Sequence, residues 1–391
     1  MNYLAVAPFR VPRRTRVRTG SFPGSIATRA NRPGRGFLRG FLLAGLGGLA
    51  LLAGCGRAAP GIIVSVAGNL VQGYTGNGGA AISAELDGPT RVAVDSARNF
   101  YIADTGNHVI RMVTFSTGII SVIAGTQTAG YSGDGGAATS AELDLPHGIA
   151  VDSSGNLFFA DTGNNVVREV IASTSLIATV AGTGAPGYSG DRGPATQATL
   201  LGPEGVALDS SGALYIADTG NNRIRRVDPA TGTITTVAGT GAIGAGGDGG
   251  PATAAQLFSP QDVAVDASGN LYIADSGNSS VRKVASSSGN ISTLAGHQTY
   301  IGHDLAAPTG LALDAFGNLY IADTGNNVVR RLGLSNGAIA TVAGTGFNGY
   351  SGDNGPATAA NIASPQGVAV NSIGVLFVAD TGNNLIRMVT F

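Results

Sequence analysis

The chain has no tryptophan and a single cysteine, Cys55, among its 391 residues. One cysteine excludes an intrachain disulfide, so packing and hydrogen bonds must hold any fold together. Charged residues make up only 12% of the sequence and aromatic residues 6%, whereas glycine occurs 62 times. No stretch keeps apolar residues at helical spacing over several turns. These deficits favour short strands joined by tight turns.

Acidic residues are missing from the first sixty positions, which contain ten arginines. An apolar run, FLLAGLGGLALLAG (Phe41–Gly54), follows the basic lead and is too short to span a bilayer comfortably as a helix. Basic residues, a short apolar run and small residues predict an export signal over residues 1–54.

The apolar run ends in LAGC, Leu52 to Cys55, which resembles a bacterial lipobox. The resemblance implies that Cys55 is lipidated and becomes the first mature residue, followed by a short linker through residue 61. The alternative is an ordinary signal peptide with a chance cysteine. We therefore expect an exported protein that is lipid-anchored in a bacterial cell envelope.

The balance of charge changes once the export signal is set aside. Nine of the 23 basic residues lie in residues 1–54, so the remainder keeps 14 basic against 24 acidic residues. An acidic domain repels nucleic acid, whose binding requires basic side chains. The same excess of acidic groups is compatible with cation binding.

An eleven-residue motif, YIADTGNHVIR in its first copy, occurs six times in the sequence. The successive gaps between its aspartates are 57, 57, 57, 48 and 57 residues. A long fixed period indicates a repeat architecture, in which each unit needs its neighbours to bury its apolar faces.

Each repeat contains four apolar runs of four to six residues, separated by Gly/Asn/Asp/Ser turns, as in residues 146–182. Such runs predict antiparallel strands. Four strands repeated six times predict an all-β fold, a six-bladed β-propeller over residues 62–391. IIVSVAG (Ile62–Gly68) matches the fourth strands and LIRMVTF (Leu385–Phe391) the third strands, so the first strand should complete blade six.

The repeated sequence motifs resemble those of a known family. GNLYIADTGNNRIRRV is similar to the NHL repeat, and the companion loop motif GYSGDGGPAT resembles the longer NHL repeats of teneurins and of many exported bacterial proteins. The resemblance implies a propeller and leaves the activity open, because propellers host many unrelated functions.

An arginine stands seven residues after the aspartate of every motif. One interpretation is a ring of carboxylates for cations, and the other is a structural brace that combines a turn with an ion pair. The strict repetition favours the brace, since sites that do chemistry usually break symmetry. The pairs are Asp104 and Arg111, Asp161 and Arg168, Asp218 and Arg225, Asp275 and Arg282, Asp323 and Arg330, and Asp380 and Arg387.

Function is better sought where the repeats differ. The connection from a fourth strand to the next first strand measures 21 residues five times but only 12 from Gly296 to Pro308. We expect these connections on the same face as the DTGN turns, which we name the DTGN face. The short connection predicts a notch on this face, lined by His297, Tyr300, His303 and Asp304. One interpretation is that the notch is a binding site, and the alternative is that the deletion has no function.

The residues after each first-strand proline also differ, and should rim the central channel on the DTGN face. The polar candidates are Arg91, His147, Glu204 and Asp262. In NHL-type lyases resembling the peptide-amidating enzyme, His in this PHG position contributes to a zinc site. His147 alone matches, with Glu204 beside it, whereas catalytic zinc needs three protein ligands.

Metal-dependent lactonases on six-bladed propellers are a second enzymatic analogy, without their acidic ligand set visible here. The aspartates of the SGDGG-like loops offer oxygen ligands for calcium, although folding their own loop is the alternative. These aspartates are Asp134, Asp191, Asp248 and Asp353, with Asn77 in the first copy.

The sequence as a whole favours a non-catalytic, lipid-anchored propeller that binds a protein, peptide or glycan, as a monomer, and that contacts the membrane only through its anchor. No cofactor is required by this interpretation. The alternative is a metal-dependent lyase or hydrolase at the channel rim, with His147 and Glu204 as its metal candidates.

Overall fold

The computed structural model describes residues 61–296 and 304–391. Three sets of predicted residues lie outside these ranges: the export signal, the expected lipidation site Cys55, and three of the four notch residues (His297, Tyr300 and His303).

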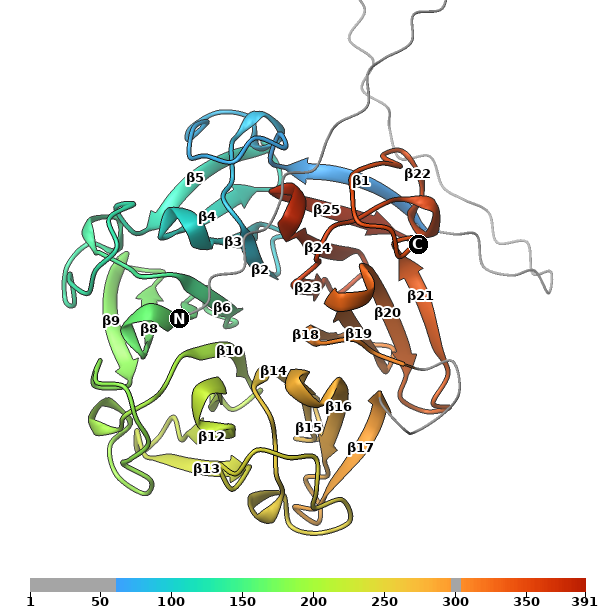
Figure 1. Cartoon of the computed structure of the whole chain (residues 1–391). Helices are drawn as coiled ribbons and strands as arrows, with labels where there is room; N and C mark the ends of the chain where they lie inside the picture. Colours follow the sequence, from blue (N-terminus) through green and yellow to red (C-terminus); the bar gives the residue numbers. More distant parts are fainter. Residues whose placement is uncertain (1–60, 297–303) are drawn as a thin grey trace, which may run out of the picture. The chain divides into compact units, whose positions relative to one another are not determined.

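Six antiparallel sheets form a ring (Figure 1). Each blade has one inner, two middle and one outer strand, and the helical segments of the described residues are three-residue 3-10 turns. The strands of blades 1 to 3 are β2 (Pro89–Val94), β3 (Phe100–Asp104), β4 (Val109–Thr114) and β5 (Ile119–Ala124); β6 (Pro146–Val151), β7 (Leu157–Asp161), β8 (Val166–Ile171) and β9 (Leu176–Ala181); β10 (Pro203–Leu208), β11 (Leu214–Asp218), β12 (Arg223–Val227) and β13 (Ile234–Ala238).

The strands of blades 4 to 6 are β14 (Pro260–Val265), β15 (Leu271–Asp275), β16 (Ser280–Val284) and β17 (Ile291–Gly296); β18 (Pro308–Leu313), β19 (Asn318–Asp323), β20 (Val328–Gly333) and β21 (Ile339–Ala343); β23 (Gly367–Val370), β24 (Leu376–Asp380), β25 (Leu385–Thr390) and β1 (Ile62–Ala67), with the two-residue β22 (Gly355–Pro356) beside β1. The predicted six-bladed β-propeller is confirmed. No helix in the part of the chain that the structure describes is long and apolar enough to cross a membrane.

The ring is closed by its first strand. β1 pairs antiparallel with β25, from Ile62 opposite Thr390 to Ala67 opposite Ile386. The resulting sheet order is β22-β1-β25-β24-β23, so a strand from one end of the described propeller completes the blade made by the other end. The closure predicted from IIVSVAG is therefore confirmed, and this junction leaves no unpaired edge between the two ends.

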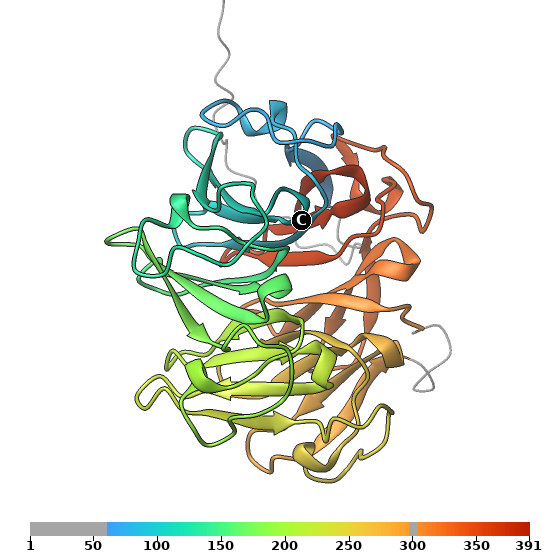
Figure 2. The ribbon, with the colours of Figure 1, turned by 60° about the vertical axis from the view of Figure 1, so that its left-hand side comes forward.

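The core lies between neighbouring blades, whose sheets pack face to face (Figure 2). Tyr101 and Ala103 on one face of blade 1 pack with Ile149 and Phe159 of blade 2, whereas Ile102, on the opposite face of the same strand, joins the cluster shared with blade 6. Both faces of a blade are buried in this way, which explains why the strands read as continuous apolar runs rather than as alternating ones.

The DTGN turns tie each blade to the next. Each is a 3-10 turn followed by a residue in the left-handed region, such as Asn165 with φ 54°. Asn tolerates this conformation, and its side chain reaches the following connection, where Asn165 Oδ1 accepts the Gly202 N–H at 2.9 Å. Thr162 Oγ1 donates to the carbonyl of Pro203 in the next blade at 2.6 Å. The repeated motif thus supplies a joint between blades as well as a turn.

The long connections do not remain on the DTGN face, which corrects the expectation that they lie there. They leave the fourth strand on that face, but their glycine-rich tips fold along the outer strand of the following blade. Near the beginning of β5, Gly78 N donates to Ile120 O at 2.8 Å and Gly79 O accepts the Ile120 N–H at 3.0 Å. Ala81 N donates to Gly118 O at 2.8 Å. Because the backbone of the tip continues the sheet beyond the outer strand, it covers much of an edge that would otherwise be unpaired.

Candidate functional sites at the channel and at the short connection

Every motif aspartate lies beside the arginine seven residues later, on the neighbouring strand. In blade 1, Asp104 Oδ2 lies 3.2 Å from Arg111 Nη1, and both side chains are fully buried. Asp104 also accepts hydrogen bonds from the Asp87 backbone N–H at 2.7 Å and from Asn107 at 2.9 Å. The carboxylate therefore fastens the end of the incoming connection to its blade.

The same ion pair recurs around the ring. The N–O distances are 3.2 Å for Asp104–Arg111, 3.6 Å for Asp161–Arg168, 3.1 Å for Asp218–Arg225, 3.1 Å for Asp275–Arg282, 3.0 Å for Asp323–Arg330 and 3.2 Å for Asp380–Arg387. Burial raises the pKa of Asp104 and of Asp161 to about 6, against the opposing effects of their hydrogen bonds and arginines. The geometry fits a brace within each blade.

A second carboxylate, from the long connection, contacts the same arginine in four blades. In blade 2, Asp134 Oδ1 lies 2.5 Å from Arg168 Nη2, while its Oδ2 accepts the Thr179 N–H at 3.1 Å. Burial alone would raise the pKa of Asp248, but hydrogen bonds from Thr293 and Arg282 outweigh it, so this pKa is lowered. These loop carboxylates, considered for calcium from the sequence, are thus engaged by protein donors.

Blade 5 lacks this second carboxylate because its connection is the short one. Its arginine, Arg330, donates from Nε to Asp323 at 3.0 Å and from Nη1 to Thr341 Oγ1 at 2.6 Å. Its side chain is 24% exposed, compared with 0% for Arg168. A cleft of about 590 Å³ opens beside it, lined also by Asn326, Thr341 and Thr345. Of the predicted notch residues, only Asp304 is described; it is exposed, and its carbonyl accepts a hydrogen bond from Asn326 at 3.2 Å.

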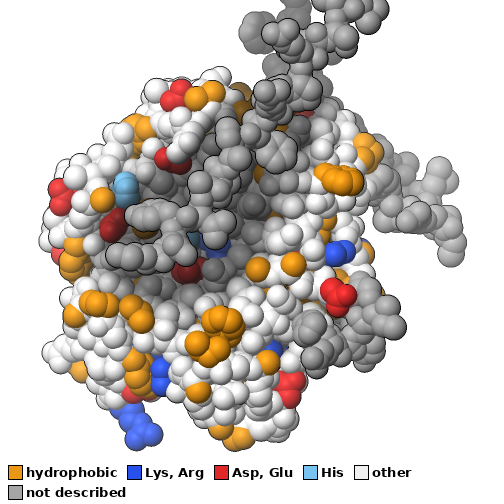
Figure 3. All heavy atoms as spheres, viewed as in Figure 1, with side chains coloured by type: hydrophobic (Ala, Val, Ile, Leu, Met, Phe, Trp, Pro, Cys, Tyr) orange, Lys and Arg blue, Asp and Glu red, His pale blue; other side chains and the backbone are white. Residues whose placement is uncertain are grey.

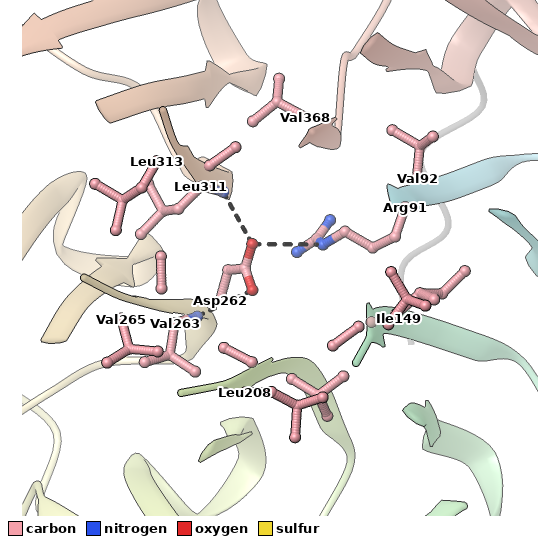
Figure 4. Close-up of a pocket in the computed structure, with 17 residues that line it drawn as sticks. Arg91, Val92, Ile149, Leu208, Asp262, Val263, Val265, Leu311, Leu313 and Val368 are labelled. Carbon is pink, nitrogen blue, oxygen red and sulfur yellow. Dashed lines mark hydrogen bonds and ion pairs between the residues drawn. The ribbon is translucent and has the colours of Figure 1, made fainter. Parts of the chain in front are cut away.

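The central channel is crossed by Arg91, which reaches from β2 toward Asp262 on β14 (Figure 4). Its guanidinium donates to the carbonyls of Gln366 at 2.7 Å and Thr309 at 2.6 Å, in blades 6 and 5. Arg91 Nε lies 3.7 Å from Asp262 Oδ2, and this carboxylate accepts the N–H of Leu311 at 2.9 Å. One arginine thus bonds blade 1 to three others across the axis.

Glycines at the equivalent position of four other inner strands make this crossing possible; they are Gly148, Gly205, Gly310 and Gly367. A Cβ built on Gly148 would lie 2.2 Å from the carbonyl oxygen of Glu204, and one on Gly205 would lie 2.5 Å from Asp262 Oδ1. No side chain fits so close to a neighbouring backbone. The inner strands therefore converge, and Arg91 and Asp262 occupy the centre that remains.

Behind this pair the channel widens into a cavity of about 260 Å³. Its lining is largely aliphatic, including Ile149, Val206, Val263 and Leu313 (Figure 4). The face with the 3-10 turns is shown in Figure 3, where acidic and basic side chains are visible in the central hollow. Charge is concentrated at one level of the axis, with apolar walls behind it.

His147 and Glu204 lie on the neighbouring inner strands β6 and β10, both partly buried. Burial, assisted by the charge of Arg91, lowers the pKa of His147 to about 4. Burial raises the pKa of Glu204 to about 7, with Asp262 adding to the rise and Arg91 opposing it. Among residues 61–296 and 304–391, no group of three or more His, Cys, Asp or Glu side chains is placed to hold a metal ion.

The sequence placed Arg91 and Asp262 at the rim but did not pair them, because the two residues lie 171 positions apart. The sequence also did not predict that Arg330 is partly exposed. A usable signal existed. Residues 297–303 contain no Asp or Glu, so Arg330 could have been recognised as one of two brace arginines without a loop carboxylate; the other, Arg111, donates to the Asn77 amide oxygen instead.

Family comparisons match parts of the described propeller. The Teneurin NHL domain matches residues 242–304, and the NHL repeat matches residues 86–111 and 200–227. Each NHL match runs from the end of a long connection to β4 or β12, and so contains one complete Asp–Arg brace. The chain carries NHL repeats on a six-bladed propeller, which confirms the resemblance seen in the sequence.

Two relatives show the extent of the similarity. Teneurin-1 of Mus musculus is 31% identical over 245 residues, which cover 57% of this chain and 9% of Teneurin-1. Protein SUPPRESSOR OF QUENCHING 1, chloroplastic, of Arabidopsis thaliana is 29% identical over 244 residues, covering 59% of this chain and 23% of that protein. The chain therefore spans less than a quarter of the length of these relatives.

Solved structures share the fold. An auxiliary nutrient binding protein from Bacteroides thetaiotaomicron superposes with a TM-score of 0.58 at 16% identity, covering 84% of this chain and 76% of that one. A streptogramin B lyase gives a TM-score of 0.52 at 12% identity, covering 85% and 98%. A binding protein and an enzyme thus share this architecture, and the choice between them depends on the sites of this chain.

Proposed function

We propose that this NHL-repeat propeller is a non-catalytic binding protein of a bacterial cell envelope, for a protein, peptide or glycan ligand. One observation carries the proposal: the charged pair at the axis, Arg91 and Asp262, is used to join blades. Arg91 donates to carbonyls of blades 4, 5 and 6, and Asp262 accepts from the backbone of Leu311 and Val263. Groups engaged in this way are withheld from a substrate.

The test is to measure binding and chemical change together. Full-length chain in detergent is incubated with separated envelope fractions of protein, peptidoglycan and polysaccharide, and the retained material is quantified and characterised by mass spectrometry. Saturable retention of chemically unchanged material is expected. Conversion of that material by the wild type, lost in His147→Ala, would overturn the proposal.

The second candidate is a lyase or hydrolase at the channel rim. The raised pKa of Glu204, about 7, favours it, since a carboxylate that titrates near neutrality suits a general base. His147 stays uncharged at neutral pH because its pKa is lowered to about 4. Activity of this kind would disappear in both Glu204→Gln and His147→Ala.

Location in the envelope is part of the proposal and is supported by the basic lead, the apolar run and LAGC. We expect Cys55→Ala to move the protein from the membrane fraction to the soluble fraction when cells are lysed and sedimented. A variant that still sediments with membranes, as the wild type does, would contradict lipidation at Cys55.

A further inference from the structure

Three blades show how the propeller receives a Tyr-Ser-Gly-Asp segment. In blades 2, 3 and 6 the brace arginine contacts the aspartate of such a segment at 2.5, 2.8 and 2.5 Å. The same arginine donates to the carbonyl of the segment's serine at 2.9, 3.0 and 3.2 Å. The tyrosine ring lies over the guanidinium, with centroid distances of 5.3, 4.9 and 4.9 Å.

The outer strand completes this receptor with a backbone donor. Thr179 in blade 2 and Ser65 in blade 6 each donate their N–H to the segment's aspartate at 3.1 Å. Blade 4 does the same for Asp248 at 2.8 Å, through Thr293. A guanidinium and an edge-strand N–H therefore form a repeated carboxylate site, in which the charged partners strengthen the hydrogen bonds.

Blade 5 has the arginine and the outer-strand residue that form this carboxylate site, but its connection contains no Tyr-Ser-Gly-Asp sequence. Arg330 pairs with Thr341 in the strand register as Arg168 pairs with Thr179. Nη2 of Arg330 makes no hydrogen bond to any residue that the structure describes. Asp304 forms no ion pair with it, and residues 297–303 contain no acidic residue. Thr341, Thr345 and Thr358 line the adjoining cleft of about 590 Å³.

We propose that this cleft binds an acidic peptide segment of a partner protein, with an aspartate on Arg330 and the Thr341 N–H and a tyrosine three residues earlier over the guanidinium. The internal segments of blades 2, 3 and 6 argue for a peptide rather than an acidic sugar, because a backbone carbonyl and a tyrosine are received with the carboxylate. The inference rests on the proposed binding function and gives it a ligand class.

The experiment measures the affinity of full-length chain for the peptide Ac-GYSGDGG-NH2, the sequence of residues 130–136, by calorimetry at peptide concentrations up to about 1 mM. Saturable binding at one site is expected, with affinity at least about tenfold lower for the peptide in which Asn replaces Asp. Glucuronate should bind more weakly than the Asp peptide. Equal affinity for the Asp and Asn peptides, tighter binding of glucuronate, or no binding of the Asp peptide would each overturn the proposal.

Thr341→Asp tests the location without removing a brace residue. The new carboxylate should pair with Arg330 and abolish peptide binding, whereas the matched Thr236→Asp in blade 3, where Arg225 already pairs with Asp191, should leave it unchanged. Peptide binding that survives Thr341→Asp would place the site elsewhere. Failure of the peptide with continued retention of envelope material would reject this cleft and leave the proposed function standing.

Discussion

Blades 2 and 5 contain the same buried aspartate and the same brace arginine, but they differ in what covers that arginine. In blade 2, Arg168 lies between Asp161 and Asp134 and is fully buried. In blade 5, Arg330 has only Asp323, and its exposed fraction rises to 24%. The strand aspartate is thus the part that every blade needs, whereas the loop aspartate can be lost without changing the strand pairing of the blade.

Removing the arginine should separate the two blades most clearly. Arg168→Met leaves two carboxylates without a cation, one of them fully buried, and should cost about 3–5 kcal/mol of unfolding free energy. Arg330→Met exposes a single carboxylate beside solvent and should cost about half as much. Urea unfolding of both variants measures the difference. Equal costs would show that the loop carboxylate contributes nothing to the brace.

Removing the loop aspartate should make blade 2 resemble blade 5. Asp134→Ala takes away one partner of Arg168 while leaving Asp161 in place, so a loss of about 1–2 kcal/mol is expected. The variant should not gain a second site for the Asp peptide, because Tyr131 and Ser132 of the chain's own segment still contact Arg168. Thermal unfolding and calorimetry check these two outcomes, and Asp304→Ala, which removes an exposed carboxylate without an ion pair, serves as the control.

The sequence predicted these blades because the repeat is local. Strand runs, turn residues and the spacing of Asp104 and Arg111 all lie within one unit, and the closure by β1 followed from matching its residues to fourth strands. The pairing of Arg91 with Asp262 could not be predicted in this way. It depends on where six inner strands converge, and on glycines whose importance appears only when the neighbouring backbone is in place.

The path of the long connections was also beyond the sequence. Their spacing located both ends correctly, but the hydrogen bonds of their tips to an outer strand, such as Gly79 with Ile120, are backbone contacts. Backbone donors and acceptors are the same for every residue type, so residue identities carried little information about this part of the fold.

Charge at the axis should affect stability independently of the cleft in blade 5. The folded pKa of Glu204, about 7, lies above its ordinary value, so ionisation is less favourable in the folded chain. Stability from this group is therefore lost as pH rises from about 4.5 to about 7, and the loss levels off above the folded pKa. Glu204→Gln should match the wild type near pH 4.5 and exceed its free energy of unfolding by about 1–3 kcal/mol at pH 8. If the variant and the wild type differ in unfolding free energy by the same amount at every pH in this range, the raised pKa of Glu204 is contradicted. As a control, Glu204→Gln should leave peptide binding at Arg330 unchanged.

The last expected effect concerns how the two ends of the blades face a membrane. β1 runs from Ile62, opposite Thr390, toward the DTGN face, so the chain enters the propeller from the opposite face. Only the six residues Gly56 to Gly61 separate Ile62 from Cys55, a reach of about 20 Å when extended. If Cys55 is lipidated, the face that contains Ser211 should lie toward the bilayer, and the end of β9 near Thr183 should lie away from it.

Ser211→Cys and Thr183→Cys, both at exposed positions, can each carry a fluorophore, with a quencher placed in the lipid headgroups. Quenching should be stronger at position 211, by a modest factor because the propeller is held close to the surface. Stronger quenching at position 183 would show that the DTGN face lies toward the membrane. A partner peptide would then have to reach Arg330 from the membrane side, and the binding proposal would require a membrane-bound partner rather than one approaching from the opposite side.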